Sequence, residues 1–139
     1  MVETHNINVD TQGHAQVLDL TERVQRFIST GTVRSGVVTV FVVGSTAGIT
    51  TTEFEPGLVN HDLHACFEKI APESGHYEHE ATWNDDNGHA HLCASLLGSS
   101  ISVPFIDKRL TLGTWQQIVL IDFDTRPRRR EIVMQVLGE

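Results

Sequence analysis

The chain has 139 residues, 18 of them acidic and 10 of them Lys or Arg, and its formal net charge is −8 at pH 7. Such a charge argues against a nucleic-acid-binding surface. No stretch approaches the ~20 apolar residues of a membrane-spanning helix, and the first twenty residues lack the apolar centre of a secretory signal peptide. We therefore expect one cytoplasmic domain over residues 1–139, with neither a membrane nor a nucleic acid as partner.

In chain order, the apolar pattern predicts a strand at 1–9, a helix at 19–28, strands at 36–44 and 49–54, a helix at 56–70, a polar irregular segment at 73–86, a helix at 88–97, and strands at 100–105, 115–123 and 131–137. The run at 36–44 is almost entirely β-branched or aromatic, which is typical of a strand buried on both faces. Because helices and strands do not alternate, we expect an α+β fold with about three helices and a mainly antiparallel sheet.

Two cysteines, Cys66 and Cys93, lie in apolar, helix-like stretches. Their spacing matches neither a CxxC motif nor a disulfide framework. We expect both to be small apolar side chains with free thiols.

Histidines are concentrated in the middle of the chain, where six of the eight lie between His61 and His91. Neutral imidazoles bind divalent ions, best of all together with a carboxylate. His79, His89 and His91 are therefore candidate ligands of a divalent metal, Zn²⁺ or Mg²⁺. On a helix His89 and His91 would point about 200° apart, so they would share one ion only in an extended turn. No HExxH or paired CxxC motif supports a closed zinc site.

Two carboxylates are candidate catalytic partners of these histidines. Glu53 lies at the end of the strand predicted at 49–54, and Asp62 lies in the following helix. Carboxylates beside imidazoles act as general acids and bases or supply oxygen ligands. The alternative for Glu53 is to stabilise the N-terminal end of that helix.

Two segments are candidates for binding phosphate. The loop Gly44-Ser45-Thr46-Ala47-Gly48 has only small residues, so its backbone N–H groups and the hydroxyls of Ser45 and Thr46 can approach an anion closely. The alternative is a tight connection between two strands. In the cluster at 126–130, Arg128 and Arg130 would share one face of a strand and form a phosphate clamp. Salt bridges between subunits are the competing interpretation of these arginines.

An ordered set of motifs, from about Gly44 to the C-terminus, resembles the YjbQ family, whose members are named secondary thiamine-phosphate synthase enzymes. The motifs are Thr50–Glu53, Glu55-Pro56-Gly57-Leu58, His61-Asp62, Tyr77-x-His79, Asn87-x-His89-x-His91, Leu96-Leu97-Gly98-Ser99-Ser100, Val103-Pro104, Leu110-Thr111-Leu112-Gly113-Thr114-Trp115-Gln116, Pro127-Arg128-x-Arg130 and Leu137-Gly138-Glu139. The sequence departs from many members at Gly44, where they have a histidine that begins a His-Thr-Ser-Ala-Ser run.

The resemblance implies a distorted sandwich that assembles as a homotrimer, with a histidine-containing site near the subunit boundary. Because His79 and His91 occupy motif positions, we expect them to converge with Glu53 or Asp62 on one polar, catalytic site. It also implies a weak thiamine-phosphate synthase activity, which joins hydroxymethylpyrimidine pyrophosphate to thiazole phosphate and releases pyrophosphate. The expected partners are therefore a phosphorylated small molecule and further copies of the chain. Two alternatives stay open: a non-catalytic homotrimer that binds a metal or phosphate, and a structural or partner-binding trimer.

Overall fold

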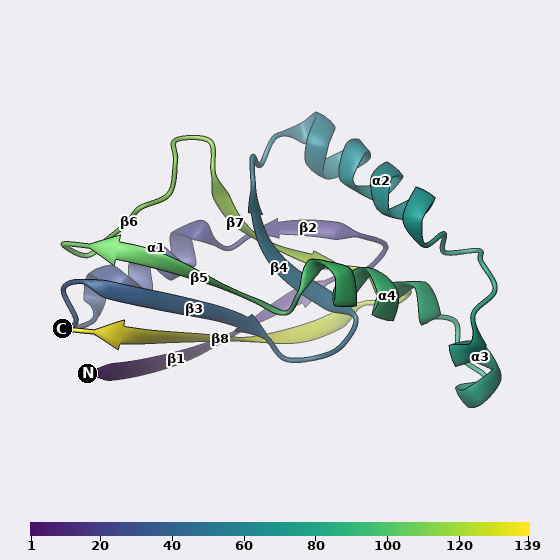
Figure 1. Ribbon diagram of the computed structural model, residues 1–139, viewed down its shortest axis with the longest axis horizontal. Coiled ribbons are helices and arrows are strands. Elements are labelled where there is room, and N and C mark those ends of the chain that lie inside the picture. The colour runs from purple at the N-terminus through teal and green to yellow at the C-terminus, as the bar shows by residue number, and fades with distance from the viewer.

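The computed structural model describes all residues from Met1 to Glu139. It has an α+β fold with two antiparallel sheets, as the sequence predicts (Figure 1). The five-stranded sheet has the order β1-β8-β3-β5-β6, and the three-stranded sheet has the order β2-β7-β4. The elements are β1 (Val2–Thr11), β2 (Gln16–Asp19), α1 (Thr21–Thr30), β3 (Gly36–Val42), β4 (Ala47–Thr52), η1 (Leu58–Asp62), α2 (Leu63–Ile70), α3 (Glu78–Trp83), α4 (Gly88–Leu97), β5 (Ser100–Ile106), β6 (Arg109–Leu110), β7 (Gln117–Asp122) and β8 (Arg128–Gly138).

Four features of the fold differ from the sequence prediction. The structure adds the four-residue strand β2, the two-residue strand β6 and the six-residue helix α3, all too short to give a periodic signal. The helix predicted at 56–70 begins with a π-helical turn, η1, before it continues as α2.

The prediction that the strand at 36–44 is buried on both faces is wrong for the single chain. Val38, Val40 and Val42 of β3 are fully buried, but Val37 is 40% exposed and Phe41 is 39% exposed. Val37 and Phe41 point to the outer face of the five-stranded sheet, because successive strand residues face opposite sides. An apolar outer face of this kind is free to pack against another chain.

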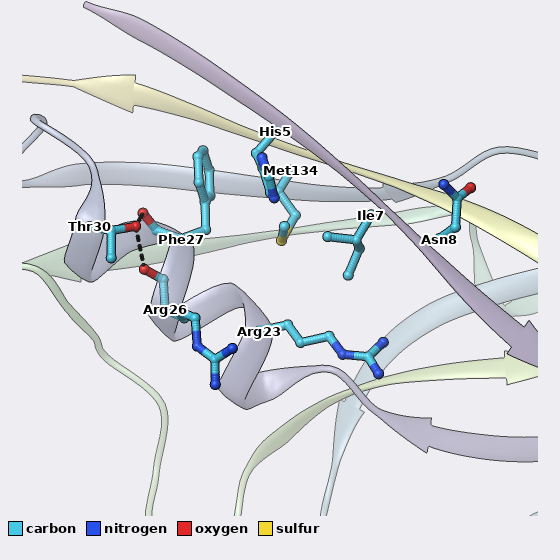
Figure 2. Close-up of a pocket in the computed structure, with 8 residues that line it drawn as sticks. All are labelled: His5, Ile7, Asn8, Arg23, Arg26, Phe27, Thr30 and Met134. Carbon is cyan, nitrogen blue, oxygen red and sulfur yellow. Dashed lines mark hydrogen bonds between the residues drawn. The ribbon is translucent and has the colours of Figure 1, made fainter.

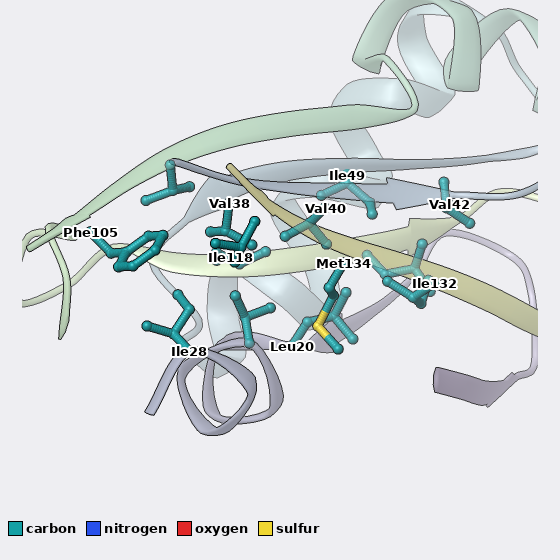
Figure 3. Packing of buried hydrophobic residues seen from close by; sticks show 14 of the residues in the cluster. Leu20, Ile28, Val38, Val40, Val42, Ile49, Phe105, Ile118, Ile132 and Met134 are labelled. Atoms are coloured by element: carbon teal, nitrogen blue, oxygen red, sulfur yellow. The ribbon is translucent and has the colours of Figure 1, made fainter. Parts of the chain in front are cut away.

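The hydrophobic core has two parts, which lie on the two faces of β7. Ile118 and Leu120 belong to a cluster of 17 buried residues between the sheets and α1, shown in Figure 3. Val119 and Ile121 belong to a second cluster of 10 buried residues, which also contains side chains of η1 and α4. The strand β7 is therefore buried on both faces, and its carboxyl end lies within the molecule instead of at its surface.

No helix is both long and apolar enough to span a membrane. The two thiols are free, as expected, and their environments differ because Cys66 is exposed and Cys93 is buried. Burial, followed by the charge of Glu68, raises the pKa of the Cys93 thiol.

The two thiols should react at very different rates. A thiolate is the reactive form, so the exposed Cys66 should react at once with a chromogenic disulfide reagent, whereas Cys93 should react only after denaturation. Counting thiols before and after adding denaturant measures this, and Cys66→Ser should remove only the fast phase. Two fast thiols in the folded protein would contradict the burial of Cys93.

Candidate functional site

The candidate site begins at the carboxyl end of β7, where two aspartates are buried in polar contacts. The side chains of Asp122 and Asp124 are 0% and 1% exposed. The Arg130 guanidinium of β8 donates from Nε to Asp122 Oδ2 over 2.7 Å and from Nη2 to Oδ1 over 3.0 Å. The hydroxyl of Thr11 on β1 donates to the same Oδ2 over 2.6 Å. The bidentate pair therefore fixes the end of β7 against two strands of the other sheet.

Asp124 is the centre of the hydrogen-bond network. Its Oδ2 accepts from the Thr46 hydroxyl over 2.8 Å and from Arg128 Nε over 3.0 Å, and its Oδ1 accepts from the Thr125 amide over 2.7 Å. Burial alone would raise the pKa of Asp124. The hydrogen bonds from Thr125 and Thr46 and the charge of Arg128 outweigh it and hold that pKa below its ordinary value of 3.8. Asp124 is therefore a fixed negative charge at neutral pH.

Asn87 connects Asp124 to His79. Its amide nitrogen donates to Asp124 Oδ1 over 3.4 Å, and its Oδ1 lies 3.0 Å from His79 Nε2. An ionised carboxylate only accepts hydrogen bonds, so the NH₂ group of Asn87 faces Asp124 and its oxygen faces the imidazole. His79 Nε2 must then carry a proton, and the lone pair of the neutral ring lies on Nδ1. The network sets the tautomer of His79.

His79 lies against His91, the second predicted imidazole. The ring centroids are 4.5 Å apart with an angle of 58° between the rings, and both residues are half-buried. The His91 ring makes no side-chain hydrogen bond within the chain, whereas its backbone oxygen accepts from Ser95. Two imidazoles, one oriented and one without a partner, can transfer protons to and from a bound molecule.

A cleft of about 290 Å³ lies beside this network and is lined by small residues. They are Gly44, Ser45, Ala47, Ala94, Ser95, Gly98 and Ser99. The backbone N–H groups of Gly44, Ser45 and Thr46 donate no hydrogen bond within the chain. Arg130 Nη1 is also unpaired, and it lies 2.8 Å from the point where a Cβ at Gly44 would be. Of these residues Gly44 and Ser45 line the cleft, and their unpaired N–H groups can bind an anion there.

The structure brings together some of the predicted site residues and separates others. The convergence of His79 and His91 is confirmed. Neither Glu53 nor Asp62 hydrogen-bonds to them: Glu53 is exposed, and Asp62 pairs with His61 over 2.9 Å. Glu53 precedes η1 and Asp62 ends it, whereas the histidines belong to α3 and α4. The carboxylate partner of His79 is instead Asp124, through Asn87. The other nearby carboxylate is Asp85, 3.9 Å from His79 Nε2.

The predicted phosphate residues have mixed outcomes. Ser45 lines the cleft. Thr46 has its hydroxyl engaged with Asp124 and Arg130. Arg128 and Arg130 share a face of β8, as predicted, but each is paired with an aspartate of its own chain. The clamp is therefore largely neutralised, and the donor of Arg130 that stays unpaired is Nη1, beside Gly44.

A metal site built from His79, His89 and His91 does not form within one chain. No three His, Cys, Asp or Glu side chains are placed to hold a metal ion. His89 is 5% exposed and its ring lies 6.4 Å from that of Tyr77, away from the His79–His91 pair. Side chains two positions apart on a helix point in nearly opposite directions, which explains the separation of His89 from His91.

Sequence reasoning missed Asp122, Asp124, Asn87 and Thr11. The available signal was Asp122 and Asp124 directly after the apolar run 118–121, because an apolar run without alternation predicts a strand buried on both faces. A charge in such a position needs a buried partner.

Comparison with known proteins extends these observations. Residues 5–139 match the model of the family described as UPF0047 protein YjbQ-like. A UPF0047 protein of Archaeoglobus fulgidus is 34% identical over 131 residues, which cover 94% of this chain and 98% of that protein. UPF0047 protein YugU of Bacillus subtilis is 31% identical over 133 residues, covering 95% and 97%.

Solved structures give the same result for the fold. The crystal structure of a hypothetical protein from Aeropyrum pernix is 35% identical, covers 99% of both chains and has a TM-score of 0.91. A YbjQ-like protein of unknown function from Sulfolobus solfataricus is 29% identical, covers 100% of both chains and has a TM-score of 0.89.

Replacing Asp124 by Asn should destabilise the protein in a pH-dependent way. At pH 7 the free energy of unfolding should fall by about 3 kcal/mol, because the buried partners of the carboxylate lose their acceptor. The pKa of Asp124 is lowered in the folded state, so its stabilising effect is complete well above 3.8 and disappears as the pH falls through the folded-state pKa. Urea unfolding at pH 7 and pH 3 should therefore show a smaller difference from wild type at pH 3.

Asp10→Asn is the matched control for that experiment. Asp10 is exposed on β1 and makes no side-chain hydrogen bond, so its replacement should change the urea midpoint little at either pH. Equal effects of the two substitutions would show that Asp124 is not the buried centre described above.

Proposed function

The chain belongs to the UPF0047/YjbQ-like protein family, and from that premise we propose that it is an enzyme acting on phosphorylated small molecules. In this proposal His79 and His91 transfer protons, and the Gly44–Gly48 loop with Arg130 binds phosphate. The observation that carries it is one hydrogen-bond network with an imidazole pair at one end and an anion cradle at the other. The network runs from His79 through Asn87 and Asp124 to Thr46 of the loop.

The imidazole end of the network supports acid–base chemistry. Asn87 fixes His79 with its proton on Nε2, which leaves Nδ1 free to accept a proton. His91 has both ring nitrogens free of side-chain partners and lies in ring contact with His79. A positioned imidazole pair of this kind contributes roughly 10²–10⁴-fold to a rate.

The cradle end supports binding of a phosphate or pyrophosphate. The backbone N–H groups of Gly44 and Ser45 and the Ser45 hydroxyl are free to donate at the cleft, and Arg130 Nη1 is unpaired beside Gly44. Donors of this kind stabilise charge that develops on a leaving group, and their preorganisation avoids reorientation during the reaction. Asp122 holds the guanidinium in place while leaving Nη1 free.

We infer that the reaction is of the thiamine-phosphate synthase type. The ring nitrogen of thiazole phosphate attacks the methylene carbon of hydroxymethylpyrimidine pyrophosphate and forms a C–N bond. The C–O bond to the pyrophosphate breaks, and pyrophosphate leaves with the electron pair. The cradle would bind the departing pyrophosphate, and the imidazoles would exchange protons with the pyrimidine.

The alternative function is a phosphate-binding protein without catalysis, which the unpaired N–H groups of the loop would serve equally well. Calorimetry with pyrophosphate and a coupling assay with both precursors separate the two functions. Binding with turnover supports the enzyme, binding without turnover supports the alternative, and the absence of both removes the proposal.

His91→Ala and His79→Ala should each lower the coupling rate at least 100-fold, because each removes one member of the proton-transferring pair. His76→Ala is the matched control, since His76 is an exposed histidine without a side-chain hydrogen bond in the preceding loop. Release of pyrophosphate measures the rate. Activity that survives in both variants would exclude the imidazoles from the reaction.

Assembly as a homotrimer is part of the proposal. Large apolar side chains are exposed in the single chain: Trp115 is 72% exposed and Leu137 is 64% exposed, in addition to Val37 and Phe41 on the outer sheet face. Light scattering at micromolar concentration should give three times the chain mass of 15.4 kDa. A monomer mass under these conditions would contradict the trimer.

A further inference from the structure

A second cavity, which shares no lining residue with the site above, lies between β1 and α1 (Figure 2). We call it the groove. Its volume of about 520 Å³ falls within the range of small-molecule sites. The residues that line it are His5, Ile7, Asn8, Arg23, Arg26, Phe27, Thr30 and Met134. None of them belongs to the network of histidines, aspartates and loop N–H groups, so the groove is independent of the proposed function.

The groove exists because the N-terminal half of β1 is not covered by other parts of the chain. Alternate residues of β1 face the interior, and their burial decreases towards the N-terminus: Thr11 and Val9 are buried, Ile7 is half-buried and His5 is exposed. His5 lies opposite Met134 in the register of β1 and β8, and Met134 is only 1% exposed. The core therefore reaches the base of the groove, and nothing from this chain fills the space above it.

The helix α1 supplies the other wall. Arg23, Arg26, Phe27 and Thr30 recur at helical spacing and face β1, whereas Val24 and Ile28 of the same helix are buried. The helix α1 therefore has two faces: one packs in the core and the other lines the groove.

The floor and the rim of the groove differ in chemistry. His5 stacks on Phe27 with ring centroids 5.6 Å apart and an angle of 20° between the rings. Together with Ile7 and Met134 these rings form an apolar, partly aromatic surface. Stacked rings 5.6 Å apart leave no room between them for a third ring, so a ligand would lie across them.

The rim carries the positive charges of Arg23 and Arg26, and no acidic residue lines the groove. Arg23 makes no hydrogen bond or ion pair within the chain, and Arg26 reaches only Glu22, over 3.8 Å, with the two side chains 73% and 90% exposed. Such an exposed pair is weak, so both guanidinium groups are available. On a chain of net charge −8 the groove is a local cationic site, in which Arg23 has no ion-pair partner and Arg26 has one weak partner.

We propose that the groove binds a small organic anion with a flat apolar body. The body lies on Phe27, Ile7 and Met134, and the carboxylate or phosphate is bound by Arg23 and Arg26, whose planar guanidinium groups suit bidentate contacts. Apolar contact and charge are both required, because the two arginines alone would bind any anion weakly at an exposed surface.

The test uses two probes that differ only in charge, 1-naphthoate and neutral 1-naphthamide. Calorimetric titration of the full chain should show that naphthoate binds at least tenfold more tightly than naphthamide. The double variant Arg23→Gln/Arg26→Gln should lose that preference. Arg129→Gln, at an exposed arginine of β8 outside the groove, should keep it.

Equal affinity for the two probes in wild type would overturn the proposal, as would a preference that persists in the double variant. Because Arg23 and Arg26 are exposed, the double variant should keep the wild-type urea midpoint, so loss of binding cannot be a loss of fold. Amide NMR shifts identify the location: shifts at His5 and Phe27 support the groove, whereas shifts confined to 44–46 would assign the anion to the other site and refute this one.

Discussion

The ion pair between Asp122 and Arg130 is the contact on which the arrangement of the two sheets and of the site depends. Asp122 ends β7 of the three-stranded sheet and Arg130 lies in β8 of the five-stranded sheet, with side chains 0% and 8% exposed. The hydroxyl of Thr11 from β1 completes the acceptor contacts of the carboxylate. Removing one partner of a buried pair costs about 3–5 kcal/mol, because the remaining charge has no water to solvate it. The two sheets therefore have one relative position at this corner.

Fixing this corner has consequences for the chemistry two residues further along the chain. Asp124 lies two residues after Asp122, and its backbone amide donates to Asp122 Oδ1 over 3.0 Å. The position of the first carboxylate therefore determines that of the second. Asp124 in turn orients Asn87, and Asn87 orients His79. The carboxylate of Asp124 can only accept a hydrogen bond, so the NH₂ group of Asn87 must face it and the amide oxygen must face His79. This leaves a single consistent arrangement of protons. A site oriented in this way has less to reorganise when a substrate binds.

Sequence reasoning succeeded where periodicity was long and failed where partners are set by tertiary contacts. The pattern of β-branched residues predicted β3, and helical spacing predicted α1 and α4. No pattern could predict β2 or β6, whose few residues are held only by pairing with β7 and β5. The meeting of His79 and His91 was predicted from motifs. Their carboxylate was not, because Asp124 is 33 residues beyond His91 and only the register of β7 brings it near.

Gly44 lies at a point of the loop where the backbone and Arg130 together leave no room for a larger side chain such as histidine. The residue has φ +128°, a conformation that L side chains rarely adopt, and a Cβ there would lie 2.8 Å from Arg130 Nη1. A histidine at 44 would therefore require both another backbone conformation and another position of the guanidinium end. Because Asp122 holds Nε and Nη2, the guanidinium has little freedom to move. We infer that glycine at 44 and the unpaired Nη1 are linked, because the absence of a side chain at 44 leaves the space that the guanidinium end of Arg130 occupies.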